Sequence, residues 1–122
     1  MNASNLPIIP IVLVSAYVAL GTLSNLCSLR HRVRAGRTLT PLNPITGLVV
    51  MLLTAIAAAL LFQGLRVGTA MLVLVLVLML WGGVYRHCFP ADRSAYASPM
   101  SRWSAVAINL FGVVAVLCAL LA

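Results

Sequence analysis

The sequence predicts an all-α membrane protein, an antiparallel bundle of four transmembrane helices that forms a single domain over residues 1–122. The composition is 63% hydrophobic and only 7% charged, whereas about a quarter of the residues in a typical soluble domain are charged. Four apolar runs are long enough to cross a hydrocarbon core, which takes about 20 helical residues. Arginines gather between these runs, as they do in short cytoplasmic loops.

The four apolar runs define the expected spans, which are residues 7–29, 45–65, 67–85 and 103–122. The third run contains MLVLVLVLML at residues 71–80, where Leu and Val alternate as in a strand. A single strand in lipid would leave its backbone groups without hydrogen bonds, so a helix is required there. Because this run is uniformly bulky, we expect it to face lipid or a large hydrophobic partner.

Proline and glycine agree with these boundaries. Pro7 and Pro10 fall in the first turn of the first span, and Pro44 starts the second, where a missing N–H costs little. Residues 63–68 contain two glycines and predict a tight turn that makes the second and third spans a hairpin. Gly82-Gly83 is expected to loosen the end of the third span.

The arginines predict the orientation. The first ten residues lack the basic segment of a secretory signal, so we expect the first span to be retained. On one side of the predicted bundle, Arg66 is the only arginine. The other side holds two loops, which carry Arg30, Arg32, Arg34 and Arg37, and Arg86, Arg93 and Arg102. By the positive-inside rule both loops are cytoplasmic and both termini face outward, in the cell's inner (plasma) membrane.

The charge balance restricts the partners. The formal net charge is +7, from eight arginines and the single acid Asp92. A basic cluster beside a membrane favours anionic lipids and acidic partner proteins, and nucleic acid is not expected. Guanidinium groups suit phosphate and carboxylate, so an anionic headgroup could bind at Arg30, Arg32, Arg34, Arg37 and Arg86. The alternative is that these arginines only fix the orientation.

The first span carries a polar stripe. Its members are small or polar and recur at spacings of three and four, which places them on one helix face: Tyr17, Gly21, Ser24, Asn25 and Ser28. The fourth span has a smaller version, made of Ala105, Asn109, Gly112 and Val116. Such faces pack helices closely, and an asparagine in hydrocarbon needs a partner. We expect helix contacts there, with a pocket or pathway as the alternative.

Few residues could support catalysis or hold a metal. The chain has no glutamate, and Asp92 lies in a loop, so no carboxylate sits in the bilayer for coupled transport or paired-carboxylate catalysis. His31, His87 and Cys88 could be metal or haem ligands, but their spacing favours ordinary interfacial side chains. The three cysteines are odd in number and indicate no disulfide framework. We expect no catalytic residue, no metal and no cofactor.

The layout resembles the membrane-associated eicosanoid and glutathione metabolism family, MAPEG. The similar segments are SLRHRVRAG at the end of the first span, the proline-flanked start of the second, GGVYRHCF at the end of the third, and SRW before the fourth. Members carry an arginine, an asparagine and a glutamate at the start of the second helix, where this chain has Leu39, Asn43 and Thr46. The resemblance implies an antiparallel four-helix bundle, trimeric in the family.

These observations lead to three functional hypotheses. The first is a non-catalytic accessory or stabilising subunit of a larger membrane complex, because the chain is rich in helix-packing surface and poor in reactive groups. The second is a MAPEG-like bundle, enzyme or inactive relative, that binds an amphipathic anionic ligand between its helices as a homo-oligomer. The third is a small pore-forming oligomer that uses the stripe on the first span.

Overall fold

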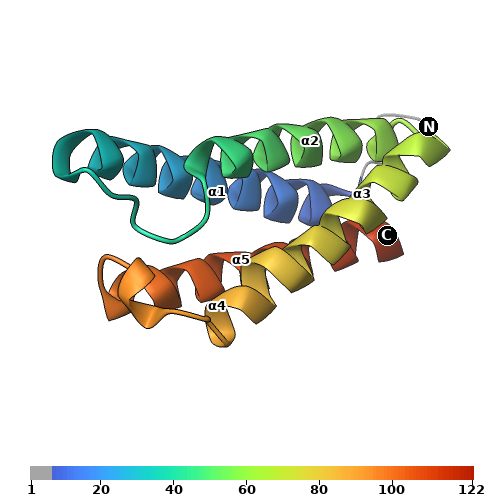
Figure 1. The fold of residues 1–122 in the computed structure, drawn as a ribbon. Helices are drawn as coiled ribbons and strands as arrows, with labels where there is room; N and C mark the ends of the chain where they lie inside the picture. Colours follow the sequence, from blue (N-terminus) through green and yellow to red (C-terminus); the bar gives the residue numbers. More distant parts are fainter. Residues whose placement is uncertain (1–6) are drawn as a thin grey trace.

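A computed structural model describes residues 7–122, and all regular secondary structure in this range is helical. The elements in chain order are α1 (Ile8–Ala35), α2 (Pro44–Phe62), α3 (Arg66–Leu78), the π-helix η2 (Met79–Tyr85), α4 (Arg86–Cys88), the 3₁₀ turn η3 (Arg93–Ala95) and α5 (Pro99–Leu121) (Figure 1). The elements α3, η2 and α4 form one continuous helical run, Arg66–Cys88. This run and α1, α2 and α5 are each long and apolar enough to span a membrane, which confirms the predicted fold class.

The first helix is longer than predicted. It continues to Ala35 rather than ending near residue 29, so the expected arginine loop is mostly helix and only residues 36–43 form a loop. Arginine is a good helix former, and its charge interacts favourably with the carboxyl end of a helix dipole. The helix ends at Gly36, which has a φ of 76° and donates its N–H to the Arg32 carbonyl oxygen at 2.9 Å.

The last helix also begins earlier than predicted, at Pro99 instead of residue 103. Ser98 caps it, because its Oγ accepts a hydrogen bond from the Ser101 N–H at 3.1 Å, and Pro99 stands in the first turn. The start of α2 is built in the same way, with the Asn43 side chain accepting from the Ile45 N–H at 3.0 Å and Pro44 following the cap.

The helices form two hairpins whose shared hydrophobic core lies toward one end. Helix α1 packs on α2, the α3 run packs on α5, and α1–α5 and α2–α3 contacts join the hairpins. The turn at residues 63–65 connects the two hairpins, and we call the end of the bundle where it lies the hairpin end. The opposite end, which has the loops 36–43 and 89–98, is called the arginine end. The core lies from the middle of the bundle to the hairpin end and consists of Val14, Tyr17, Met51, Ala57, Ala58, Leu72, Val75, Met79, Ala115, Val116 and Ala119. Figure 1 shows the hairpins spreading apart toward the arginine end.

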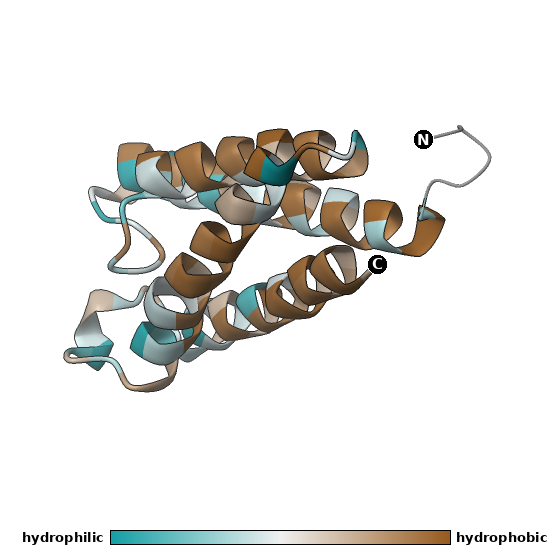
Figure 2. Cartoon of the chain, turned by 90° about the vertical axis from the view of Figure 1, so that its right-hand side faces the viewer, coloured by the Kyte–Doolittle hydropathy of each residue, from teal (hydrophilic) through white to brown (hydrophobic). Residues whose placement is uncertain are grey.

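The helices consist mostly of hydrophobic residues (Figure 2). Large hydrophobic side chains such as Leu52, Leu74 and Val114 are more than half exposed, which suits contact with lipid chains. The sequence predicts a third span that faces lipid or a large hydrophobic partner. One of its faces is exposed, whereas Leu72 and Val75 on the other are buried in the core of the chain itself. One exposed apolar face and one buried face are what a helix of a multi-pass membrane protein requires.

Candidate binding cavity

A cavity of about 780 Å³ occupies the space between the hairpins in the arginine half of the bundle. Core residues Tyr17, Met51 and Met79 form its base. Its walls come from α1, α2, the η2 segment and α5, and it is covered by residues 39–43 of the first loop and by Ser98. The cavity thus begins where the hydrophobic core stops.

The polar stripe of the first span faces this cavity. Five of its members line the cavity, namely Tyr17, Gly21, Ser24, Asn25 and Ser28. From the fourth span, Ala105 and Asn109 line it as well. Gly112 does not, and instead packs against the Tyr17 ring so closely that a Cβ there would collide with the ring carbons. The structure therefore brings the two asparagines to one cavity and uses Gly112 for helix packing.

The two asparagines have the same local arrangement. Asn25 Nδ2 donates to the Gly21 carbonyl oxygen at 2.7 Å, and Asn109 Nδ2 donates to the Ala105 carbonyl oxygen at 2.8 Å. Each amide lies against a glycine of the neighbouring helix, Gly47 in α2 for Asn25 and Gly83 in η2 for Asn109, where a Cβ would collide with Oδ1. Each Oδ1 accepts no hydrogen bond from the described residues.

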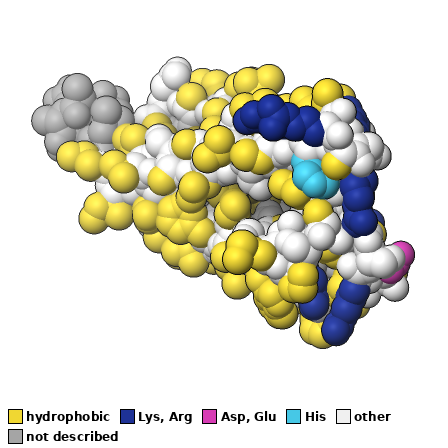
Figure 3. All heavy atoms as spheres, turned by 90° about the vertical axis from the view of Figure 1, so that its left-hand side faces the viewer, with side chains coloured by type: hydrophobic (Ala, Val, Ile, Leu, Met, Phe, Trp, Pro, Cys, Tyr) yellow, Lys and Arg dark blue, Asp and Glu magenta, His cyan; other side chains and the backbone are white. Residues whose placement is uncertain are grey.

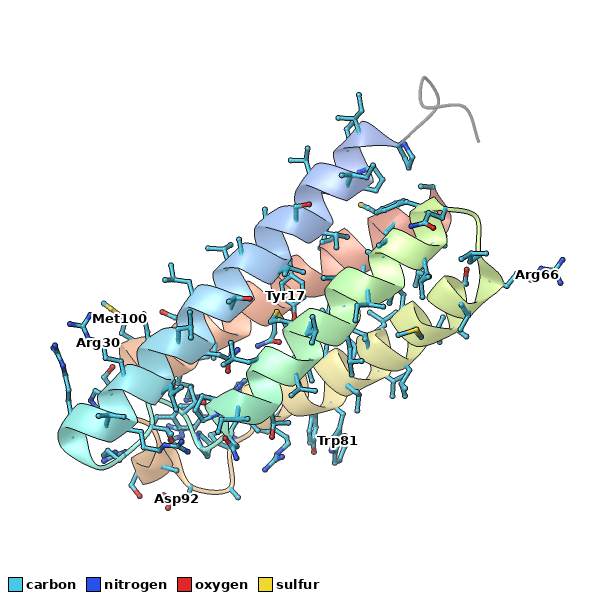
Figure 4. The ribbon with its side chains drawn as sticks, turned by 90° about the horizontal axis from the view of Figure 1, so that it is seen from above. Tyr17, Arg30, Arg66, Trp81, Asp92 and Met100 are labelled. Carbon is cyan, nitrogen blue, oxygen red and sulfur yellow. The ribbon has the colours of Figure 1, made fainter. Side chains whose placement is uncertain are left out.

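Tyr17 places a hydroxyl at the base of the cavity. Its side chain is only 1% exposed, yet the hydroxyl forms no hydrogen bond within residues 7–122. No polar side-chain atom in this range is both fully enclosed and without a partner, so the hydroxyl keeps a small exposed area, and Tyr17 is one of the residues that line the cavity. Figure 4 shows Tyr17 pointing into the space between the helices.

Arg86 is the arginine that lines the cavity. Its side chain is exposed, and its guanidinium has no hydrogen bond or ion pair with the described residues. It also borders a second cavity of about 250 Å³ next to the second loop. The other predicted headgroup-binding residues, Arg30, Arg32, Arg34 and Arg37, lie outside both cavities. Figure 3 shows arginine side chains gathered at one end of the molecule, and Arg66 lies at the opposite end from Arg30 (Figure 4).

The two loops of the arginine end are joined over the cavity. The Ala97 N–H donates to the Leu39 carbonyl oxygen at 3.0 Å, and the Leu39 N–H donates to Ser28 Oγ at 3.0 Å. Arg37 Nη2 donates to the Ser94 carbonyl oxygen at 2.8 Å. Arg37 is therefore engaged in holding the loops together.

The second loop has its own fixed structure. Asp92 caps η3 by accepting hydrogen bonds from the N–H and hydroxyl of Ser94, which lower the pKa of its carboxyl group. The Tyr96 hydroxyl and His87 Nδ1 are 2.6 Å apart in a buried pair. Burial raises the pKa of the Tyr96 phenol, so this residue keeps its proton for that contact.

Arg102 joins the third and fourth spans. Its Nε and Nη2 donate to the carbonyl oxygens of His87 and Cys88, both at 2.8 Å, at the carboxyl end of the α3 run. Its guanidinium also lies 4.6 Å from the centre of the Trp103 ring. These contacts complete hydrogen bonds that the last helical carbonyls would otherwise lack.

We expect Arg102→Ala to lower the free energy of unfolding by about 2 kcal/mol, since two charge-assisted hydrogen bonds are lost. The measurement is an unfolding titration with sodium dodecyl sulfate in mixed micelles. Arg93→Ala is the matched control, because Arg93 is exposed and makes no side-chain hydrogen bond within the described residues. Equal stability of the two variants would contradict this role for Arg102.

The histidines and cysteines do not come together as a metal site. His31 Nδ1 lies 2.6 Å from the Arg37 carbonyl oxygen, whereas His87 is paired with Tyr96. Within residues 7–122 no group of three His, Cys, Asp or Glu side chains has the proximity to hold a metal ion. Cys27, Cys88 and Cys118 are free thiols.

The sequence interpretation missed several residues that line the cavity. On α5 these include Ser101, Ser104 and Ile108, and on α2 they include Thr46 and Gly47. The α5 residues could have been found, because Ser101, Ala105 and Asn109 continue the stripe at a spacing of four toward the amino end of that helix.

The cavity reaches the outer surface of the bundle. Trp81 and Met100 line it, although their side chains are 63% and 77% exposed. Trp81 stacks on Tyr85, with ring centroids 5.0 Å apart and planes 10° from parallel, and Figure 4 shows Trp81 at the edge of the bundle. The lining of the cavity therefore extends to exposed side chains of the bundle surface.

The fold and the apolar surface define a multi-pass α-helical membrane protein. No protein-family model matches the chain, and comparisons with curated proteins and with solved structures also give no match.

Proposed function

We propose that this protein binds an amphipathic molecule with an anionic headgroup in the cavity between its two hairpins. The observation that carries the proposal is the unpaired Arg86 guanidinium at the edge of a cavity of about 780 Å³. Pockets for small ligands measure about 300–1,000 Å³ and combine apolar walls with a few polar groups. The headgroup would bind Arg86, and the chain would lie against Met51, Met79 and Ile108.

The chemistry of Arg86 fits this headgroup. A guanidinium group forms paired hydrogen bonds with phosphate and carboxylate oxygens. Its position near the end of the α3 run corresponds to the headgroup layer of a bilayer. The predicted orientation in the inner membrane, with the arginine end cytoplasmic, then puts the ligand in the cytoplasmic leaflet.

Binding without catalysis also fits the resemblance to MAPEG. Leu39, Asn43 and Thr46, at the positions where that family carries arginine, asparagine and glutamate, all line the cavity. They supply no acid or base, so the proposal is a ligand-binding relative of such bundles and not a conjugating enzyme.

The two other hypotheses have less support. The core fills the hairpin half of a single copy, so a pore would have to form between copies. The polar stripe expected to line such a pore instead faces the cavity within one copy. The accessory-subunit hypothesis stays a prediction, because a lipid-compatible surface suits a bilayer as well as a partner protein.

The direct test of the proposal is binding of tetradecyl phosphate to the full chain in phosphatidylcholine nanodiscs, with empty nanodiscs as background. We expect Arg86→Ala to weaken binding about tenfold, because a charge-assisted contact is lost. Arg93→Ala should bind like the wild type, since Arg93 borders neither cavity. Binding that is equal in Arg86→Ala and the wild type would contradict the proposal.

A further inference from the structure

We propose that the ligand carries a hydrogen-bond donor, a hydroxyl or amide N–H, about one helical turn below its anionic group. This inference rests on the proposed function and adds a chemical class to its ligand. It follows from the two asparagines of the cavity, whose side-chain orientation is fixed by their hydrogen bonds.

Both asparagines of the cavity keep a side-chain acceptor without a donor among the described residues. The backbone carbonyl oxygens of Gly21 and Ala105 can only accept, so the atoms that reach them at 2.7 and 2.8 Å must be the amide nitrogens of Asn25 and Asn109. Each Oδ1 is therefore on the opposite side of its amide group. Each oxygen lies against the glycine of the neighbouring helix, has no donor among the described residues and is not fully enclosed. Because both asparagines and both glycines line the cavity, we infer that a donor on the ligand reaches these oxygens from there.

The neighbouring glycines give the depth of these acceptors. Asn109 lies against Gly83, one helical turn before Arg86 in the same run. Asn25 lies against Gly47, one turn inside the start of α2. Both oxygens are thus about a turn closer to the bundle centre than the headgroup level. The Tyr17 hydroxyl, two turns before Asn25 on α1, is a third polar group without a partner among the described residues.

This arrangement selects among anionic lipids. At the same depth a diacyl glycerophospholipid has two ester carbonyls, which are acceptors and cannot bond to another acceptor. Desolvating the asparagine oxygens without a donor would weaken binding. A monoacyl lipid with a free glycerol hydroxyl, a hydroxyacyl chain or an amide-linked chain supplies the missing donor.

The test compares two probes that differ in one hydroxyl group. These are lysophosphatidic acid and its analogue in which the free glycerol hydroxyl is replaced by hydrogen, each titrated into the full chain in phosphatidylcholine nanodiscs. We expect lysophosphatidic acid to bind about tenfold more tightly than the analogue. In Asn25→Leu/Asn109→Leu the two probes should bind equally.

The outcomes separate this inference from the proposed function. Equal binding of both probes to the wild type would overturn the donor requirement while leaving the anionic site in place. Failure of both probes to bind would overturn both. If the double variant does not fold, the single variant Asn109→Leu replaces it. If that variant still distinguished the two probes as strongly as the wild type does, groups other than Asn109 would be responsible, which would contradict the inference.

Discussion

Replacing Gly68 by leucine is expected to lower the free energy of unfolding by about 3 kcal/mol, because the helices of the hairpin end have no room for a side chain there. A Cβ at Gly68 would lie 2.7 Å from the Ala57 carbonyl oxygen and would collide with the Leu61 backbone nitrogen. Both atoms belong to the backbone of α2, so no rotamer change can relieve the contact. The two helices must move apart, which opens the core.

The measurement is the same detergent unfolding titration, with Gly82→Ala as the control. Gly82 lies on the same helical run, but a Cβ there has no neighbour within 4 Å. We therefore expect the control to keep its stability to within about 0.5 kcal/mol. If Gly68→Leu were as stable as Gly82→Ala, the close packing of α2 and α3 would be disproved.

Ser24→Trp is expected to abolish binding of tetradecyl phosphate, with affinity reduced at least about a hundredfold. Ser24 is half-buried in the wall of the cavity, between Tyr17 at the base and Arg86 at the headgroup level. An indole group at this position would occupy the path of the alkyl chain. The substitution lies in the cavity wall and changes no core residue, so the unfolding titration of this variant should match that of the wild type.

The matched control is Leu23→Trp, which adds the same ring at the adjacent position. The Leu23 side chain is 59% exposed and does not line the cavity. Its replacement by another apolar group should leave binding and stability unchanged. Equal binding by Ser24→Trp and Leu23→Trp would exclude the cavity as the ligand site.

The fold was predictable because lipid imposes strict limits on it. A span needs a certain apolar length and must satisfy its own backbone, so the four runs had to be helices. The ends of the helices were harder to predict. Arg32 and Arg34 can stay helical beyond the hydrocarbon because their long side chains reach polar surroundings from a helix as well as from a loop.

The candidate site was predictable in part. The spacing of Ser24, Asn25 and Ser28 identified the correct face of α1, but a small polar stripe looks the same whether a helix or a cavity lies against it. The difference depends on how far the hairpins diverge. That divergence depends on helix packing, such as that of Gly68 on α2 and, between segments remote in sequence, that of Gly112 on Tyr17.

Native mass spectrometry of the full chain, extracted from its own membrane in mild detergent, tests the binding of an amphiphile most directly. We expect a chain that carries one bound amphipathic molecule with an anionic group. This molecule should remain with Leu23→Trp and be absent from Ser24→Trp. A wild-type chain without such a molecule would contradict binding in the cavity, and so would a molecule that both variants hold equally well.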